Sequence, residues 1–422
     1  MTRAVGLPWV LGLLTLVAIL PPGPYGRAAS ERGQDLARVM SEVEKVRGLP
    51  FLRQVPVETP AGDEGRALLA RLVARELPDD VARSQARILE GLQLLPGGYD
   101  LRGELEKILR RQALGLYDGE RGVMVIFGGH VATGGPHPRT VWIHEYDHAL
   151  IDQHFGFERR RAAFDRPGRE DRQLAWLALA EGDAVLTMLL ATAASGDPDV
   201  ESFLRGLDEP TAGGASALDR APAWVRTLLL EPYRLGTRLV AGAWRRGGWE
   251  AVNALWREPP LSTEQLLHAD RRGELPGEPA MPPPPDGWRR AGVLQLGELG
   301  IGAWLGTRLD RAWATRAAAG WDGDRVELLE AVAGGRPGGE APRQRLRVLT
   351  AWDSGRDVAE FVDAVVDWLD QAQETVARWT LRQSGRNVEI DIDLRASPAG
   401  GVEVLDDDPW SGVAFTGPPG GG

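Results

Sequence analysis

The chain has 422 residues, enough for one large or two medium domains with a substantial core. Its formal net charge of −11 and pI near 5.2 argue against nucleic acid as a main partner, because nucleic-acid binding normally requires a basic surface. The absence of cysteine excludes disulfides, thiolate metal ligands and a catalytic thiol.

Residues 1–29 are typical of an export signal. Arg3 supplies a positive charge, residues 5–20 form an apolar stretch, and PPGP then precedes the small residues Ala28 and Ala29. The apolar run is shorter than the ~20 residues that a spanning helix needs. We therefore expect an exported protein, secreted or periplasmic, with an uncleaved N-terminal membrane anchor as the alternative.

Hydrophobic periodicity predicts a series of helices in the first part of the chain. They are expected near residues 33–47, 63–76, 79–95 and 101–115. QVPVE at 54–58 and GVMVIFGG at 122–129 are typical of short strands. We expect the strand from Val123 to Phe127 to edge a substrate cleft, where it would bind an extended substrate through main-chain hydrogen bonds.

The segment HEYDH, which begins at His144, matches the pattern H-E-x-x-H on a helix expected to start at Thr140 and end at Gly156. Residues i and i+4 of a helix point to the same side, so the imidazoles of His144 and His148 can reach one ion. Zn²⁺ prefers such ligands, and Glu145 would act as general base on a water molecule that the ion activates. The spacing predicts a zinc hydrolase.

Two residues compete for the role of third zinc ligand. His154 occupies the position at which metzincins keep a third histidine, but Ile151 stands where that pattern has glycine. A β-branched residue cannot take the required turn cheaply, and a continuing helix would rotate His154 about 120° away from His148. Glu181 lies in an apolar helix expected from about Glu170 to Ala194, where a carboxylate without a partner would be costly.

We therefore predict Glu181 as the third ligand. We also expect its helix to be buried in the protein and not to span a membrane, since Glu181 and Asp183 would each cost about 2.5–3.5 kcal/mol in a bilayer. Asp183 lies on a different face from Glu181 and is assigned no ligand role. Asp152, four residues after His148, either orients an imidazole from outside the ligand set or is solvated.

The second half is predicted to be mainly helical, with surface loops rich in glycine and proline. Helices are expected near 223–256, 263–270, 290–318, 323–334 and 357–380. GWDGDR, which begins at Gly320, is typical of a turn whose aspartates cap the next helix, and NVEIDIDLRASPAGGVEV, from Asn387, is typical of a final hairpin. Tyr233 and His268 are candidates to stabilise an oxyanion, with structural roles as the alternative.

H-E-x-x-H followed by a helix-borne glutamate is the gluzincin pattern, and HEYDHALID resembles the signature helix of thermolysin-like peptidases. More closely, the chain resembles a family of exported bacterial predicted metallopeptidases with this motif. The similar stretches include RGLPFLRQVPV, GLYDGERGVMVI, HEYDHALIDQHF, ALAEGDA, PPLSTEQLLH, AAAGWDGDR and TAWDSGRDVAEF. The resemblance implies a zinc-protease fold with His144, His148 and Glu181 as ligands and Glu145 as base.

The expected fold is α+β and predominantly α, with a zincin-like core, a small sheet and a helical second lobe flanking the zinc cleft. The expected divisions are 1–29 (signal or anchor), 30–197 (ligand helices), 198–385 (helical lobe) and 386–422 (strands and tail). We expect an exported zinc metallopeptidase of gluzincin type that acts on a peptide or protein substrate. The alternatives are a catalytically silent zinc-core binding or envelope-assembly module, and a zinc hydrolase of a non-peptide amide.

Overall fold

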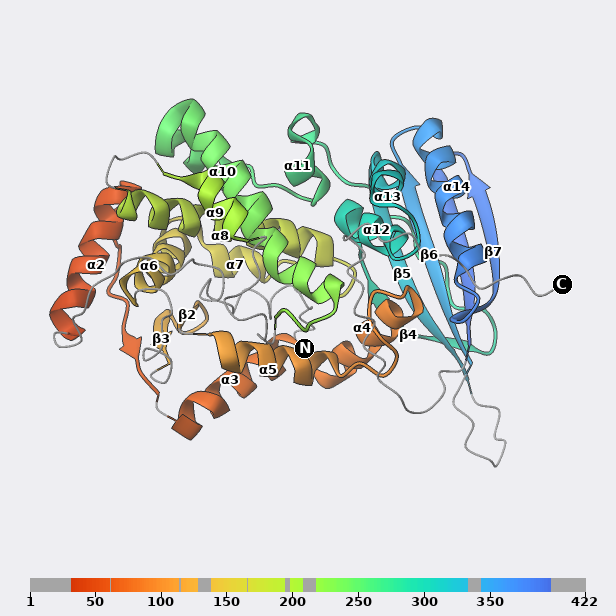
Figure 1. Ribbon diagram of the computed structural model, residues 1–422, viewed down its shortest axis with the longest axis horizontal. Helices are drawn as coiled ribbons and strands as arrows, with labels where there is room; N and C mark the ends of the chain where they lie inside the picture. The colour runs from red at the N-terminus through yellow and green to blue at the C-terminus, as the bar shows by residue number, and fades with distance from the viewer. Residues whose placement is uncertain are drawn as a thin grey trace.

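The computed structural model describes residues 32–60, 62–113, 115–127, 138–164, 166–193, 198–207, 218–332 and 343–395. The expected export signal, and the part of the expected final hairpin beyond residue 395, lie outside these residues. The fold is α+β with helix predominating, as the sequence predicted. A helical half carries a small sheet, and a second half contains a larger sheet (Figure 1).

The first half is built mainly from helices. Its elements are α2 (Arg32–Arg47), β1 (Val57–Glu58), α3 (Gly62–Glu76), α4 (Asp79–Gly91), α5 (Leu101–Gln112), β2 (Gly115–Asp118), β3 (Val123–Ile126), α6 (Pro138–Phe155), α7 (Phe157–Arg161), α8 (Glu170–Thr192), α9 (Val200–Gly206) and α10 (Ala223–Arg257). Helices α2, α3, α4 and α5 lie near the positions that the sequence predicts for them. Strand β2 is not predicted from the sequence, because its four residues follow α5 almost directly.

The small sheet has the strand order β1-β3-β2. β3 pairs in parallel with β1 and antiparallel with β2, so both of its sides are occupied. The prediction that this strand edges the cleft is therefore wrong. β2 is an outer strand instead, and it packs against α6.

Helix α8 is the centre of the helical half. It packs against α6, α2 and α10, and its residues from Glu170 to Met188 are almost all buried. Its length and composition would suit a membrane span, but 83% of its most apolar window is buried inside the fold. The helix is apolar on all sides because it is surrounded by other helices.

The second half contains a five-stranded antiparallel sheet of order β4-β5-β6-β8-β7. Its elements are α11 (Glu264–Leu267), a 3-10 turn (Ala269–Arg271), β4 (Trp288–Leu294), α12 (Gly297–Gly306), α13 (Arg311–Ala318), β5 (Trp321–Ala331), β6 (Gln344–Trp352), α14 (Gly355–Gln371), β7 (Val376–Ser384) and β8 (Asn387–Leu394). Helices α12, α13 and α14 lie along the sheet (Figure 1), and α4 from the first half packs against β4 and β5.

This sheet corrects the expectation of a helical lobe over 198–385. The helix predicted at 323–334 is strand β5, and the one predicted at 290–318 begins with strand β4. The expected boundary at 386 is also misplaced, because β8 pairs with both β6 and β7. β5 is buried on both faces, so its sequence lacks the alternation of a half-exposed strand.

Gly320 lies in a turn, with φ of 80°, as predicted, but the rest of the segment GWDGDR is the start of β5. Asp324 in this segment does cap a helix, but that helix, α12, precedes it in the chain. Asp324 accepts hydrogen bonds from the backbone N–H groups of Leu296 and Gly297, both at 2.9 Å, where α12 begins. The buried indole of Trp321 donates to the same carboxylate at 3.0 Å.

Candidate metal centre

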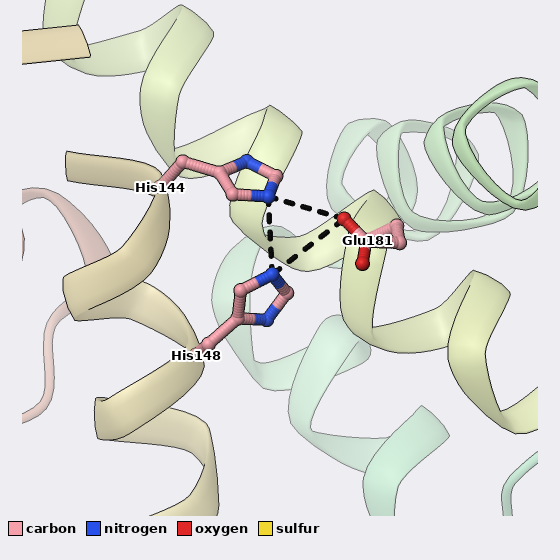
Figure 2. Close-up of side chains that lie close together, drawn as sticks. All are labelled: His144, His148 and Glu181. Carbon is pink, nitrogen blue, oxygen red and sulfur yellow. Dashed lines mark hydrogen bonds and ion pairs between the residues drawn. The ribbon is translucent and has the colours of Figure 1, made fainter. Parts of the chain in front are cut away.

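Helices α6 and α8 bring three potential metal ligands to one point (Figure 2). His144 and His148 lie one turn apart on the side of α6 that faces α8, and Glu181 projects from α8 between them. Helix α6 ends at Phe155 because Gly156 takes the left-handed conformation, with φ of 64°, as the sequence predicted for this glycine. The two imidazoles are thus carried by an uninterrupted helix.

The separations between the ligand atoms suit a single ion. Nε2 of His144 lies 3.1 Å from Oε2 of Glu181 and 3.0 Å from Nε2 of His148, and the remaining separation is 3.5 Å. Three donors placed tetrahedrally at 2.0–2.2 Å from Zn²⁺ would be roughly 3.4 Å apart. The donor set of two imidazoles and one carboxylate is also a typical catalytic zinc set.

Hydrogen bonds alone cannot satisfy all the polar atoms of this cluster. The two Nε2 atoms face each other, so a single proton can serve only one of them as donor, whereas a cation would be bound by both nitrogens and by Glu181. Nδ1 of His144 is buried and has no hydrogen-bond partner among the described residues. The site departs here from the usual histidine ligand, whose second ring nitrogen donates to an acceptor.

The charges within the cluster are strongly coupled. Burial acts to lower the pKa of His148, but Glu181, Glu145 and Asp147 outweigh it and raise this pKa to about 9. Burial acts to raise the pKa of Glu181, but His148 and His144 bring it down to about 2. At neutral pH the metal-free site therefore contains an imidazolium–carboxylate pair in the place where an ion would carry the positive charge.

Glu145 lies beside the ligands and is 3% exposed. It lines a cavity of about 60 Å³ together with His148 and Glu181, and Tyr117, Leu177 and Ala180 form part of the same wall. Gly115 on β2 packs against it, because a Cβ at that position would lie 3.8 Å from Cγ of Glu145. The acid next to the first histidine thus faces a small cavity at the ligand cluster.

A close helix crossing brings Tyr233 to the site. A Cβ on Gly182 would lie 2.2 Å from the backbone of Gly236, and a Cβ on Gly236 would lie 1.8 Å from the carbonyl oxygen of Ala178. With both glycines present, α10 approaches α8 so closely that the ring of Tyr233 lies 6.3 Å from that of His144.

Tyr233 is 3% exposed and lies close to Glu181 and Glu145. Burial, with the nearby carboxylates of Glu181 and Glu145, raises its pKa well above the usual value, so the hydroxyl keeps its proton. Of the two predicted oxyanion candidates, Tyr233 is therefore the one that the fold brings to the ligands.

His268 and His154 have partners of their own. Nε2 of His268 bonds to Oε1 of Glu298 at 2.7 Å, near the junction with the large sheet, so the structure gives no support to its predicted catalytic role. Nε2 of His154 bonds to the carbonyl oxygen of Pro50 at 2.6 Å, and this histidine is absent from the ligand cluster.

Asp152 forms its hydrogen bonds with residues other than the ligand histidines. It accepts hydrogen bonds from the hydroxyl of Tyr117 at 3.0 Å and from the backbone N–H of Glu158 at 2.9 Å. Within the described ranges it forms no hydrogen bond with His148, so the predicted orienting contact is not made. Because Tyr117 lines the cavity beside Glu145, Asp152 positions a wall of that cavity.

Sequence reasoning missed the buried network behind the ligands. Arg47 is fully buried and donates to both oxygens of Asp183, at 2.8 and 3.0 Å, and the indole of Trp256 donates to the same carboxylate at 2.6 Å. The cost of a lone carboxylate in an apolar helix was a signal that Asp183 needs a partner. It could not identify one that lies 136 residues away.

A second carboxylate on α6 faces the same network. Asp147 is fully buried and accepts a hydrogen bond from the hydroxyl of Thr187 at 2.9 Å. Burial, together with the charge of Asp183, raises the pKa of Asp147 to about 7. The hydrogen bond between Asp147 and Thr187 thus joins the ligand helices α6 and α8.

Comparison with known proteins gives one match. A family model described as "Domain of unknown function (DUF8575)" matches residues 289–402. The match covers the five-stranded sheet with α12, α13 and α14, and it excludes the ligand cluster. No curated protein and no solved structure matches the chain.

Proposed function

We propose that the protein is a zinc-dependent peptidase of gluzincin type, with a zincin-like core formed by α6, α8 and the small sheet. The observation that carries the proposal is the convergence of His144, His148 and Glu181, with Glu145 on the wall of the adjoining cavity. This arrangement combines a complete set of three zinc ligands with a neighbouring carboxylate that can move a proton.

The roles of the side chains follow from their positions. Zinc, when bound by the three ligands, would polarise a carbonyl group and lower the pKa of a water molecule. Glu145 would accept the proton of the attacking water and transfer it to the nitrogen of the leaving amine. Tyr233, which keeps its proton because of its raised pKa, would donate a hydrogen bond to the carbonyl oxygen as negative charge develops there.

The decisive experiment is a cleavage screen with a proteome-derived peptide library. Zinc-loaded protein is expected to cut peptides, and the Glu145→Gln variant should bind the same amount of zinc while turnover falls by at least a hundredfold. Glu201→Gln, at an exposed position on α9, is the matched control and should keep full activity. Absence of cleavage by the wild type, or equal cleavage by Glu145→Gln, would reject the proposal.

We also propose that the protein is exported. The support is the pattern of residues 1–29, which combines a positive charge, an apolar stretch and small residues. N-terminal sequencing of the protein from its native host should recover a chain that begins near residue 30. Recovery of Met1 in the membrane fraction would show an anchored protein instead.

A further inference from the structure

A second, larger cavity adjoins the cavity at the ligand cluster. Its volume is about 680 Å³, within the range of pockets that hold small ligands and short peptides. It lies between one face of α3, the end of β1 and the turn that joins β2 to β3. Arg75 and Asp118 line both cavities, so the larger one is a direct neighbour of the cavity that Glu145 lines.

Two of the three arginines that line the larger cavity are already paired. Arg75 forms ion pairs with Glu76 and Glu120, both at 2.8 Å. Arg121 pairs with Glu58 and approaches Asp118 at 3.9 Å. Their charges are neutralised within the fold, so neither offers a free cation to a ligand.

Arg71 is the exception. It is exposed, it lines the same cavity, and in the part of the chain that the structure describes it has no ion-pair or hydrogen-bond partner. Glu64 on the same helix is likewise exposed and unpaired within the described ranges. Leu68 lies between these two charges along α3, and Leu72 directly follows Arg71. The cavity wall therefore presents a free anion, an apolar side chain and a free cation in sequence.

The spacing of these groups suits an extended polypeptide. At about 1.5 Å per helical residue, Arg71 lies about 6 Å and Glu64 about 16 Å along α3 from Arg75, which borders the ligand cavity. An extended chain rises about 3.3 Å per residue. A peptide lying along α3 would meet Arg71 about two residues, and Glu64 about five residues, beyond the boundary between the cavities.

We propose that this cavity binds an extended segment of a peptide substrate and that Arg71 selects an acidic side chain near the bond to be cleaved. The inference rests on the proposed peptidase function and names its substrate class. A guanidinium group binds a carboxylate through paired, charge-assisted hydrogen bonds, which make it an effective recognition element in a partly enclosed cavity.

Peptide binding to the zinc-loaded Glu145→Gln protein tests the inference without requiring turnover. The probes are fluorescein-labelled decapeptides in which Glu, Gln or Lys occupies each position in turn of an alanine–serine background, measured by fluorescence anisotropy. At one position the Glu peptide should bind about tenfold more tightly than the Gln peptide. Adding Arg71→Glu should abolish this preference and favour Lys, and Arg71→Gln should abolish it without favouring Lys.

The matched control is Arg83→Glu, on the exposed side of α4 and outside the lining of the cavity, which should keep the preference for Glu. An unchanged preference in both Arg71 variants, or failure of every peptide to bind, would overturn the inference. Cleavage by the wild type is scored separately. Cleavage without a preference that depends on Arg71 would reject the acidic subsite and leave the peptidase function standing.

Discussion

At the scale of single residues, two carboxylates two positions apart on α8 have different partners. Glu181 faces the histidine pair, whereas Asp183 accepts hydrogen bonds from Arg47 and Trp256. The helix rotates by about 200° between them, so each side chain meets a different neighbour. Only the first is placed to bind a metal ion.

Metal content should distinguish the two candidates for third ligand. Glu181→Ala removes one of three donors, so purified protein should lose most of its zinc. His154→Ala removes only a contact with the backbone of Pro50, so its zinc stoichiometry should equal that of the wild type. Inductively coupled plasma mass spectrometry measures both. Zinc retained by Glu181→Ala and lost by His154→Ala would contradict the assignment of ligands.

Metal binding should also release a proton. With a pKa of about 9, His148 is protonated at pH 7.5 in the metal-free protein, and it must lose that proton before Nε2 can bind an ion. Zinc affinity should therefore rise about tenfold per pH unit and level off above pH 9. Titration calorimetry in two buffers of different ionisation enthalpy should give about one proton released per zinc, and no release would show that His148 is neutral in the metal-free site.

At the scale of secondary-structure elements, the crossing of α8 and α10 determines which residues reach the site. Gly182 and Gly236 lie in contact at this crossing, and Tyr233 is about one turn from Gly236 on α10. A helix pair with ordinary side chains at the crossing would be separated by 8–10 Å. The glycines therefore determine how near the tyrosine comes to His144.

Gly182→Ala tests this crossing. The new Cβ would overlap the backbone of Gly236, so we expect a loss of about 3 kcal/mol in the free energy of unfolding and a marked loss of activity. Gly242→Ala is the control on α10, because its Cβ would meet only the flexible end of Arg246. That variant should be neutral or more stable by up to about 1 kcal/mol. Urea denaturation measures both, and equal effects would show that the crossing tolerates a side chain.

The ligand helices could be predicted from sequence because their signals are local. The four-residue spacing of His144 and His148 specifies a helix face, and Glu181 is conspicuous as a carboxylate in an apolar helix. Strand β5 could not be predicted in the same way. Its segment VELLEA contains good helix formers, and only pairing with β4 and β6 makes it a strand. The partner of Asp183 was unpredictable for the same reason, because it depends on long-range contacts.

At the scale of the whole molecule, buried acids at the start of α8 join the helical half to the second half of the fold. Glu170 accepts a hydrogen bond from the backbone N–H of Gln295 at 2.9 Å, and Asp171 accepts one from the backbone N–H of Thr263 at 3.1 Å. Burial raises the pKa of each to about 7, and burial with the charges of Asp353 and Glu298 raises that of Glu264 to about 8.

These acids should make the metal-free protein less stable at alkaline pH. Their pKa values in the unfolded chain are near 3.8 for Asp and 4.5 for Glu, so between about pH 4 and pH 8 the folded state binds more protons. The free energy of unfolding then falls as pH rises, by up to about 1.4 kcal/mol per unit of pKa shift for each group. His148 acts in the same direction up to about pH 9.

Urea denaturation in the presence of a chelator should therefore give a higher midpoint at pH 5.5 than at pH 8.5. Both values lie above the range in which Glu181 titrates. Glu264→Gln removes the acid with the most raised pKa of the three and should reduce the difference between the two midpoints. Glu201→Gln, at an exposed position, should leave the difference unchanged. A midpoint that rises with pH would contradict the assignment of these acids as protonated in the fold.

The contact between Gly182 and Gly236 also has a consequence for finding relatives of this chain in genomes. Neither position accepts a Cβ without moving the other helix, so the two glycines restrict each other through the fold. The first directly follows Glu181, the proposed third metal ligand, and the second stands three residues after Tyr233. A search for H-E-x-x-H, then E-G, then Y-x-x-G would therefore select chains in which the tyrosine can reach the metal ligands, and would separate them from chains that share only the histidine motif.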